Sequence, residues 1–290
     1  MISSYFIHIG ILIGMYIIIA VSLNLALGYT GLLNLGHVAF FGIGAYTSAL
    51  LTKQGVPFLA AFLCAGLVAS LFGLILVWAT RKLKGDYLAL ATLGFSYVIY
   101  SLMINLTEIT RGPLGIPGIS KPVIFGFMLK SNLVYLVFVA AVAIVTVLVI
   151  KRIITSPFGR LLQATRDDEL GLNVLGKDTR KLKMKAMMIS AFFAGISGSL
   201  FAHYIGYIEP GSFLLTELIV MLTIVIVGGL ASIKGSIAAS FIIIILPEFI
   251  RFLSLPSSIV GPARQIVYAL ILIGILLVRP RGIFGKVDLQ

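Results

Sequence analysis

The stretch PFLAAFLCAGLVASLFGLILVWAT, residues 57–80, contains no charged side chain. A helix needs about 20 predominantly apolar residues to cross the roughly 30 Å of hydrocarbon in a bilayer, so this stretch is long enough to span a membrane. A second uncharged stretch, NLVYLVFVAAVAIVTVLVI at 132–150, has the same character. Both are continuously apolar, whereas the strands of a transmembrane β-barrel alternate between apolar and polar residues. The two stretches therefore predict membrane-spanning helices.

The composition of the whole chain agrees with this prediction. Of the 290 residues, 60% are hydrophobic and only 11% are charged, whereas a soluble domain carries about 25% charged residues. We therefore expect an all-α polytopic membrane protein with about 8–10 transmembrane helices, some of them interrupted or re-entrant. Residues 1–290 are expected to form a single transmembrane domain.

The basic residues are concentrated in three short segments. Nine lie between Lys151 and Lys185, three at 81–84 and three near the C-terminus, which accounts for 15 of the 22 Lys and Arg residues. The positive-inside rule places such segments, and with them the C-terminus, in the cytoplasm. The net charge of +12 is thus explained by topology, and no nucleic-acid partner is expected. The fifteen residues are Lys151, Arg152, Arg160, Arg166, Lys177, Arg180, Lys181, Lys183, Lys185, Arg81, Lys82, Lys84, Arg279, Arg281 and Lys286.

From these cytoplasmic segments the spans can be followed along the chain. The connections expected outside are 107–131 and the turn YIEPGSF after residue 206. The side of the N-terminus depends on whether residues 28–38 turn at the inner face, which places it outside, or 28–52 only dip into the membrane, which places it inside. The expected spans are 5–27, 57–80, 87–106, 132–150, 186–206, 216–233, 236–250 and 265–278.

Glycine and proline interrupt several of these apolar segments. Gly228 and Gly229, Pro247 and Pro256 lie within or beside the later spans, and irregular backbone survives at membrane depth only where protein or a water-filled cavity shields it. Two small-residue pairs, Gly44-x-x-x-Ser48 and Gly195-x-x-x-Ser199, have the spacing that permits close approach of helices. A packed bundle with broken helices is expected.

The stretch GYTGLLNLGHVAFFGIGAYTSALL, residues 28–51, is the most unusual of these segments because it is uncharged yet rich in glycine and polar groups. We interpret it as an interrupted or re-entrant element lining a translocation passage, in which a half-helix beginning near Gly36 presents its positive dipole end. The alternative is that the glycines allow tight packing and the polar side chains satisfy neighbouring backbone. The candidate passage residues are Asn24, Thr30, Asn34, Gly36 and His37.

Residues 151–185 form the only sizeable polar segment. Ser156 and Pro157 are typical of a helix start, and four leucines (Leu161, Leu162, Leu170 and Leu175) give an intermittent apolar face. A short amphipathic helix of this kind can dock into a groove on another protein. The alternative is a solvated loop that only fixes topology. The candidate coupling residues are Arg166, Asp167, Asp168, Glu169 and Gly176.

Five blocks, in order along nearly the whole chain, resemble the permease subunits of branched-chain amino acid ABC importers, of the LivM kind. The blocks are LNLALGYTGLLNLGHVAFFGIGAYTSALL, LKGDYLALATLGFSYVIY, TRGPLGIPGIS, ATRDDELGLNVLGKDTRKLKMKA and VGGLASIKGS. The fourth is similar to that family's cytoplasmic loop that docks onto the ATPase subunits.

This resemblance implies a transport subunit of a prokaryotic cytoplasmic (inner) membrane importer that translocates leucine, isoleucine and valine. Its implied partners are a second, LivH-like permease subunit, two ATP-binding cassette subunits, an extracytoplasmic substrate-binding protein and membrane lipid. The chain contains no Gly-x4-Gly-Lys-Ser/Thr phosphate loop. It is therefore expected to bind no cofactor directly, and ATP with Mg²⁺ is expected in the partner subunits.

Three other functions are considered. A permease for urea or another small polar solute shares much of this pattern. An ion-coupled secondary amino-acid carrier would need intramembrane carboxylates, for which Glu217 and Glu248 are the candidates, both near predicted span ends. An enzyme is not expected, because the chain has only three histidines (His8, His37 and His203) and its acids lack metal-ligand spacing.

Overall fold

The computed structural model describes residues 2–124, 126–129, 131–248, 257–279 and 281–285. Residues 249 and 250 of the expected 236–250 span, together with Pro256 and Lys286, lie outside the described residues. The described α-helices are α1 (Ile2–Thr30), α2 (His37–Lys53), α3 (Phe58–Ala79), α4 (Gly85–Asn105), α5 (Thr107–Thr110), α6 (Asn132–Thr155), α7 (Pro157–Asp167), α8 (Glu169–Val174), α9 (Thr179–Ile205), α10 (Leu215–Gly228), α11 (Ile233–Ile245) and α13 (Ser257–Val278).

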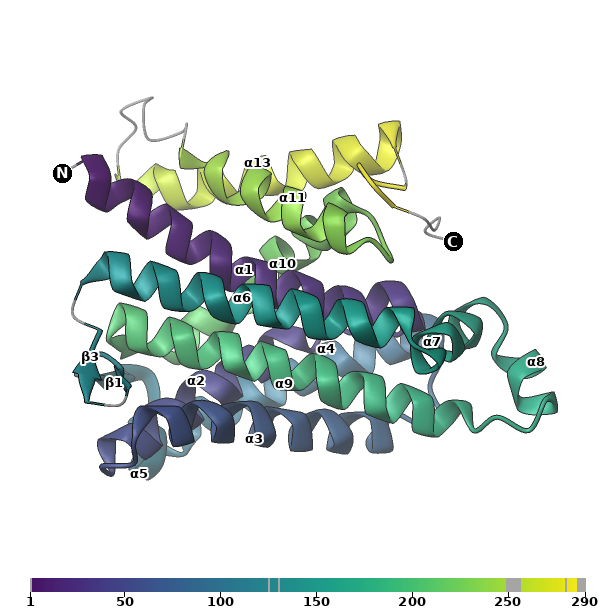
Figure 1. Ribbon diagram of the computed structural model, residues 1–290, viewed down its shortest axis with the longest axis horizontal. Coiled ribbons are helices and arrows are strands. Elements are labelled where there is room, and N and C mark those ends of the chain that lie inside the picture. The colour runs from purple at the N-terminus through teal and green to yellow at the C-terminus, as the bar shows by residue number, and fades with distance from the viewer. Residues whose placement is uncertain (1, 125, 130, 249–256, 280, 286–290) are drawn as a thin grey trace.

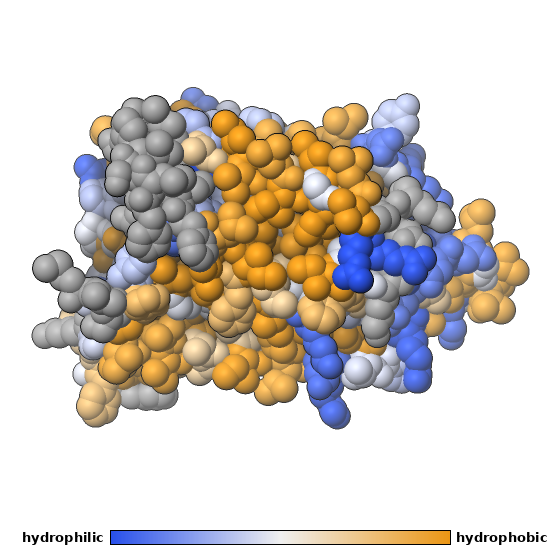
Figure 2. All heavy atoms as spheres, turned by 90° about the horizontal axis from the view of Figure 1, so that it is seen from above, coloured by the Kyte–Doolittle hydropathy of each residue, from blue (hydrophilic) through white to orange (hydrophobic). Residues whose placement is uncertain are grey.

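The long helices run along the longest axis of the molecule and pack side by side (Figure 1). Within the described residues, seven helices are long and apolar enough to cross a membrane, and α11 is a shorter apolar helix. On the face seen in Figure 2, hydrophobic residues cover the middle of the bundle and most of the strongly hydrophilic residues lie toward one end. The prediction of an all-α polytopic membrane protein is confirmed.

The two ends of the bundle differ in character. One end, here called the basic end, carries α7, α8 and the connection between α3 and α4 (Figure 1). The opposite end, here called the strand end, carries two short antiparallel pairs, β1 (Ile116–Pro117) with β4 (Tyr207–Ile208) and β2 (Val123–Ile124) with β3 (Phe127–Met128). The sequence did not predict these small strands, which lie in the segments expected outside the membrane.

Small residues bring α2, α3 and α9 into close contact. A Cβ atom added at Gly44 would lie 2.6 Å from the carbonyl carbon of Gly195, and one added at Gly195 would lie 2.6 Å from the carbonyl oxygen of Ala65. The Ser199 hydroxyl donates a hydrogen bond of 2.7 Å to the Ser48 hydroxyl. The two small-residue pairs singled out in the sequence therefore lie at a close helix contact, as their spacing predicts, and the structure shows that they meet each other.

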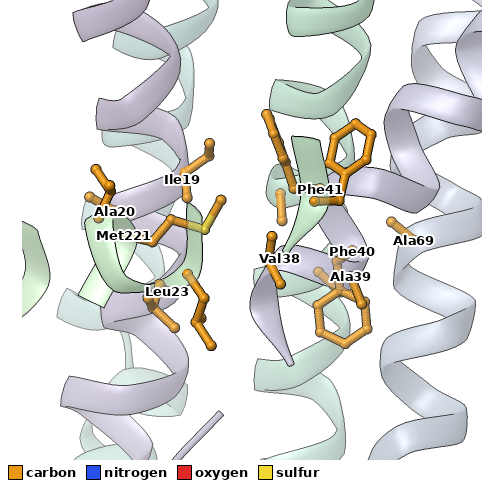
Figure 3. Close-up of a cluster of buried hydrophobic side chains, with 14 of the residues drawn as sticks. Ile19, Ala20, Leu23, Val38, Ala39, Phe40, Phe41, Ala69 and Met221 are labelled. Atoms are coloured by element: carbon orange, nitrogen blue, oxygen red, sulfur yellow. The ribbon is translucent and has the colours of Figure 1, made fainter. Parts of the chain in front are cut away.

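Buried side chains of α1, α2 and α10 belong to one hydrophobic core cluster, which appears as two groups in Figure 3. Figure 3 shows Ile19 and Leu23 of α1 beside Met221 of α10, with Phe40 and Phe41 of α2 in the second group of side chains. Phe40 is fully buried and Phe41 is 3% exposed. The start of α2 is therefore an interior element, which explains why that stretch carries no charge.

Most predicted spans match helices within a few residues, and the differences have local causes. Helix α1 continues to Thr30 instead of ending at residue 27. Helix α9 begins at Thr179, ahead of the predicted 186, because the Asp178 carboxylate caps it by accepting from the Lys181 amide at 3.1 Å. Helix α13 begins at Ser257 and runs through Pro262, where the sequence predicted a start at 265.

Candidate functional site

The break between α1 and α2 is built from residues 31–36. Gly31, with φ of 69°, ends α1, and the amides of Gly31 and Leu32 donate back to the carbonyls of Leu27 and Ala26, both at 3.1 Å. This is the hydrogen-bond pattern of a glycine-terminated helix end. The chain then turns back, and α2 starts at His37 inside the bundle. The predicted interruption is confirmed, although it begins after Thr30 and not at Gly28.

Two side chains replace the missing helical hydrogen bonds in this break. The Thr92 hydroxyl of α4 accepts from the Leu35 amide at 2.9 Å and donates to the Leu33 carbonyl at 3.2 Å. The Asn34 side-chain oxygen accepts from the Gly36 amide at 3.0 Å. Irregular backbone is thus satisfied by protein at membrane depth, as the absence of water there requires.

A second break, between α10 and α11, is satisfied by one side chain from α1. The Asn24 amide nitrogen donates to the carbonyls of Gly229 and Ser232 at 3.3 and 3.2 Å and to the Ser236 hydroxyl at 2.7 Å. Its oxygen accepts from the Ala231 amide at 2.9 Å. Asn24 therefore joins α1 to the α10–α11 hairpin.

The other candidate passage residues also lie inside the bundle. Thr30 and Asn34 are each 1% exposed and His37 is fully buried. The Thr30 hydroxyl donates to the Ala26 carbonyl, and His37 lies 3.1 Å from the Ser22 hydroxyl and 3.4 Å from the Asn34 amide. A Cβ atom on Gly36 would lie 2.7 Å from the Thr92 carbonyl oxygen.

The five candidates thus surround two helix breaks, and in this conformation their polar atoms bond to the protein. These contacts are those expected of packing residues, and a passage-lining role stays a prediction. The break at Gly36 packs directly against α4, so a bulky residue there disturbs the bundle as well as any passage. Sequence reasoning missed Thr92, whose only sequence signal is a hydroxyl within an apolar helix.

The two intramembrane carboxylates lie near span ends, as expected. Glu217 is in the first turn of α10 and accepts a hydrogen bond from the Tyr16 hydroxyl of α1. Glu248 accepts from the Tyr5 hydroxyl and lies 3.5 Å from the Arg264 guanidinium. Both carboxylates therefore connect α1 with the C-terminal helices.

The polar segment 151–185 forms two helices where one amphipathic helix was expected. The Ser156 hydroxyl caps α7 by accepting from the Gly159 amide at 3.3 Å, which confirms the predicted helix start. Leu162 of α7 is fully buried against the bundle. Helix α7 therefore packs on its own chain, and only α8 extends beyond it (Figure 1).

Arg166 connects α7 to the end of α1. Its guanidinium donates to the Gly28 carbonyl at 2.8 Å and pairs with Asp167 at 2.8 Å. Its aliphatic part lies over Gly31, where an added Cβ would be 3.0 Å from the Arg166 Cγ. A cation at the C-terminal carbonyls of a helix is favoured by the helix dipole. Arg166 thus joins the end of α7 to the start of the break at residues 31–36.

Glu169 attaches α8 to the rest of the basic end. Its carboxylate pairs with Lys183 of α9 at 2.7 Å and with Lys84 of the α3–α4 connection at 3.2 Å. Burial by itself raises the pKa of Glu169, but the two lysines outweigh that effect and hold its pKa below the ordinary value. The ionised carboxylate therefore stabilises the position of α8. Sequence reasoning missed both lysines as partners, because basic residues are abundant at this end.

The remaining coupling candidates shape α8 itself. The Asp168 carboxylate caps α8 by accepting from the Gly171 amide at 2.9 Å, and Gly176 follows the helix with φ of 74°. Leu170, Val174 and Leu175 are 71, 87 and 76% exposed. Figure 2 shows hydrophobic spheres at the same extremity of the molecule, beyond the hydrophilic residues. These three side chains, here called the α8 apolar face, form an unpartnered surface at the tip of the basic end. The docking roles of the five coupling candidates stay predictions.

Comparison with known proteins relates this arrangement to transport permeases. Residues 5–278 match the model of a family described as branched-chain amino acid transport system, permease component. The chain is 38% identical, over 87% of its length, to the high-affinity branched-chain amino acid transport system permease protein LivM of Escherichia coli strain K12. It is 24% identical, over 95% of its length, to the LivH permease of the same system from that strain. No solved structure matches the chain.

The matches cover these relatives to different extents. The alignment spans 65% of the length of the Escherichia coli LivM protein and 92% of the length of LivH. A relative named for a different solute, the autoinducer 2 import system permease protein LsrC of Yersinia pseudotuberculosis, is 25% identical over 81% of the chain and 66% of its own length. The relatives of this chain are thus named for more than one solute.

Proposed function

The chain belongs to the family of branched-chain amino acid transport permease components, and we propose that it is a membrane-spanning subunit of an ABC importer that translocates leucine, isoleucine and valine. The LivM relatives, named for this transport, support the substrate assignment. The similarity to LivH supports pairing with a second, dissimilar permease. A substrate-binding protein outside the membrane delivers the amino acid, and the basic end faces the cytoplasm.

The observation that carries this proposal is the α8 apolar face. Two exposed apolar side chains, Leu170 and Val174, lie on the six-residue helix α8, and the third, Leu175, follows directly at its C-terminal end, at the tip of the basic end and outside the spans. Burying them against a groove on an ATP-binding cassette subunit removes apolar surface from water, as in other helix-in-groove contacts. Glu169, held by Lys84 and Lys183, keeps this helix attached to α4 and α9. ATP with Mg²⁺ is bound and hydrolysed in that partner.

The connection from α8 to the membrane runs through the neighbouring helix α7. Arg166 at the end of α7 holds the last turn of α1, and α1 is joined to the α10–α11 hairpin by Asn24. Nucleotide-driven movement of α8 therefore shifts α1 and the break at 31–36 between two arrangements of the bundle. In alternating access, the bundle shifts its population between these two arrangements.

The ATPase partner is tested by co-purification and by ATP-dependent uptake in proteoliposomes. Val174→Asp places a charge in the α8 apolar face and is expected to reduce both ATPase association and uptake by about tenfold or more, because a buried unpaired charge is costly. Val123→Asp, the same change at a 42% exposed position of the strand end, is the matched control and should leave association unchanged. Equal association of both variants would contradict docking at α8.

The substrate is tested in the same proteoliposomes with the binding protein supplied. Leucine, isoleucine and valine should each be taken up in an ATP-dependent manner, and excess of one should compete with the others. Urea should be neither transported nor competitive. Uptake of urea without uptake of leucine would show that the chain is a subunit of a urea importer. Uptake that persists without the ATPase subunits and follows an ion gradient would instead indicate a secondary carrier.

A further inference from the structure

A cavity of about 800 Å³ opens at the basic end, and its lining reaches Leu32 in the break at residues 31–36. It lies between the α3–α4 connection on one side and α8 with the start of α9 on the other. Its inner wall is apolar and includes Leu32, Val77, Leu88 and Met187, whereas its rim is polar. An apolar wall below a polar rim suits an amphiphile better than a fully hydrated ion.

The rim carries a strong excess of positive charge. Six cations and two carboxylates line the cavity, a formal excess of four positive charges. Like charges gathered around a concave, partly apolar surface focus the field and raise the local concentration of anions. The six cations are Arg81, Lys82, Lys84, Arg180, Lys181 and Lys183, and the carboxylates are Glu169 and Asp178.

The carboxylates of the rim do not neutralise all of these cations. Both already have lysine partners, on α9 and on the α3–α4 connection. Arg81, Lys82 and Arg180 have no ion pair with an acid among the residues that the structure describes. Two of them are arginines, whose planar guanidinium donates two parallel hydrogen bonds to a phosphate.

The position of the cavity indicates where its ligand comes from. The Arg81 guanidinium lies 5.4 Å from the centre of the Trp78 ring, and Trp78 is 62% exposed near the end of the spanning helix α3. Exposed tryptophan at a span end is typical of the level of the lipid headgroups. Arg81 is therefore held at the depth where phosphates of the membrane surface lie.

We propose that this cavity binds the phosphate headgroup of an anionic phospholipid, with Arg81 and Arg180 as its main ligands and the apolar wall against the glycerol and first acyl carbons. Basic pockets between helices on the cytoplasmic side are suited to such headgroups. A zwitterionic amino acid carries no net charge and gains little from this field. Free inorganic phosphate shares the headgroup chemistry but lacks the apolar part. The proposal does not depend on the transported substrate.

The test uses the full chain in phosphatidylcholine nanodiscs, with and without phosphatidylglycerol, and with inorganic phosphate added in a separate arm. Retained lipid is measured by native mass spectrometry and stability by the thermal midpoint. Phosphatidylglycerol should be retained preferentially and raise the midpoint. The double variant Arg81→Gln with Arg180→Gln should lose roughly 30-fold in lipid affinity, since each cation near the surface contributes comparably.

The matched control is Arg160→Gln with Lys177→Gln, which removes the same charge from exposed positions of the basic end outside the cavity. The control should retain phosphatidylglycerol like the original chain. Equal loss in both double variants would show a diffuse surface attraction and overturn the site. Stabilisation by inorganic phosphate without preference for phosphatidylglycerol would overturn the lipid assignment, as would the absence of any response in either arm.

Discussion

Substitution of Gly44 by alanine should loosen the contact between α2 and α9. The added Cβ would lie 2.6 Å from the carbonyl carbon of Gly195, whereas ordinary contacts of this kind begin at 3.4 Å. The helices must therefore separate by about 1 Å, and such a gap removes roughly a quarter to a half of the dispersion energy of the affected atom pairs. Separation on this scale also breaks the hydrogen bond between Ser199 and Ser48.

The expected magnitude follows from these two effects. Overpacking of a close contact costs about 1–3 kcal/mol, a lost buried hydrogen bond costs about 1 kcal/mol, and the higher helix propensity of alanine returns about 1 kcal/mol. The net destabilisation of about 1–3 kcal/mol corresponds to a decrease of roughly 3–10 °C in the thermal midpoint. The midpoint can be measured by size-exclusion chromatography of heated, detergent-solubilised protein.

The matched control is Gly94→Ala on α4. Nothing lies within 4 Å of a Cβ atom built on Gly94, so the same change in a helix interior meets open space. It should leave the midpoint unchanged or raise it slightly, because only the helix propensity changes. A Gly44→Ala protein as stable as Gly94→Ala would refute the idea that α2 and α9 pack through glycine.

Three other perturbations address the basic end and the topology. Glu169→Gln should destabilise the attachment of α8 by about 1–2 kcal/mol and increase the amide hydrogen exchange of α8. Because folding lowers the pKa of Glu169, the attachment should be intact above the ordinary pKa of 4.5 and should weaken as the pH falls through the lower pKa of the folded state. Arg166→Ala should leave ATPase association intact but lower the uptake per ATP hydrolysed, with unchanged coupling as the contrary result. Cysteines placed at 112–120 should react with an external reagent, whereas those at 160–180 should react only after permeabilisation, and the reverse pattern would invert the proposed orientation.

Local sequence features predicted the spanning helices because the length and apolar character of a span depend only on the residues within that span. The uncharged stretch at 57–80 needs no partner to identify it, and small-residue spacing at Gly44 and Gly195 predicted close helix contacts but not that these two glycines meet. Capping was also local, as the serine before Pro157 shows. The predicted helix boundaries were least accurate where a helix continues into a polar segment. The start of α9 was predicted from the beginning of the apolar residues at 186, whereas the helix begins after its capping residue, Asp178.

The partners of polar residues could not be predicted in the same way. Glu169 has many lysines within reach along the chain, and only the fold selects Lys84 and Lys183. The side chain of Asn34 could face a passage or the backbone, and the structure shows that its oxygen accepts a hydrogen bond from the backbone amide of Gly36. Since a sequence pattern reports residue types but not which segments meet, site geometry required the three-dimensional arrangement.

The hydrogen bonds of Asn24 have a consequence for how the chain is made. Its partners lie 205–212 residues later, so they do not yet exist when α1 leaves the ribosome. A carboxamide facing lipid tails without a partner costs several kcal/mol. Until the α10–α11 hairpin is synthesised, the Asn24 side chain therefore needs other hydrogen-bond partners, either water or other polar groups. A chain truncated before that hairpin lacks all four hydrogen-bond partners of Asn24.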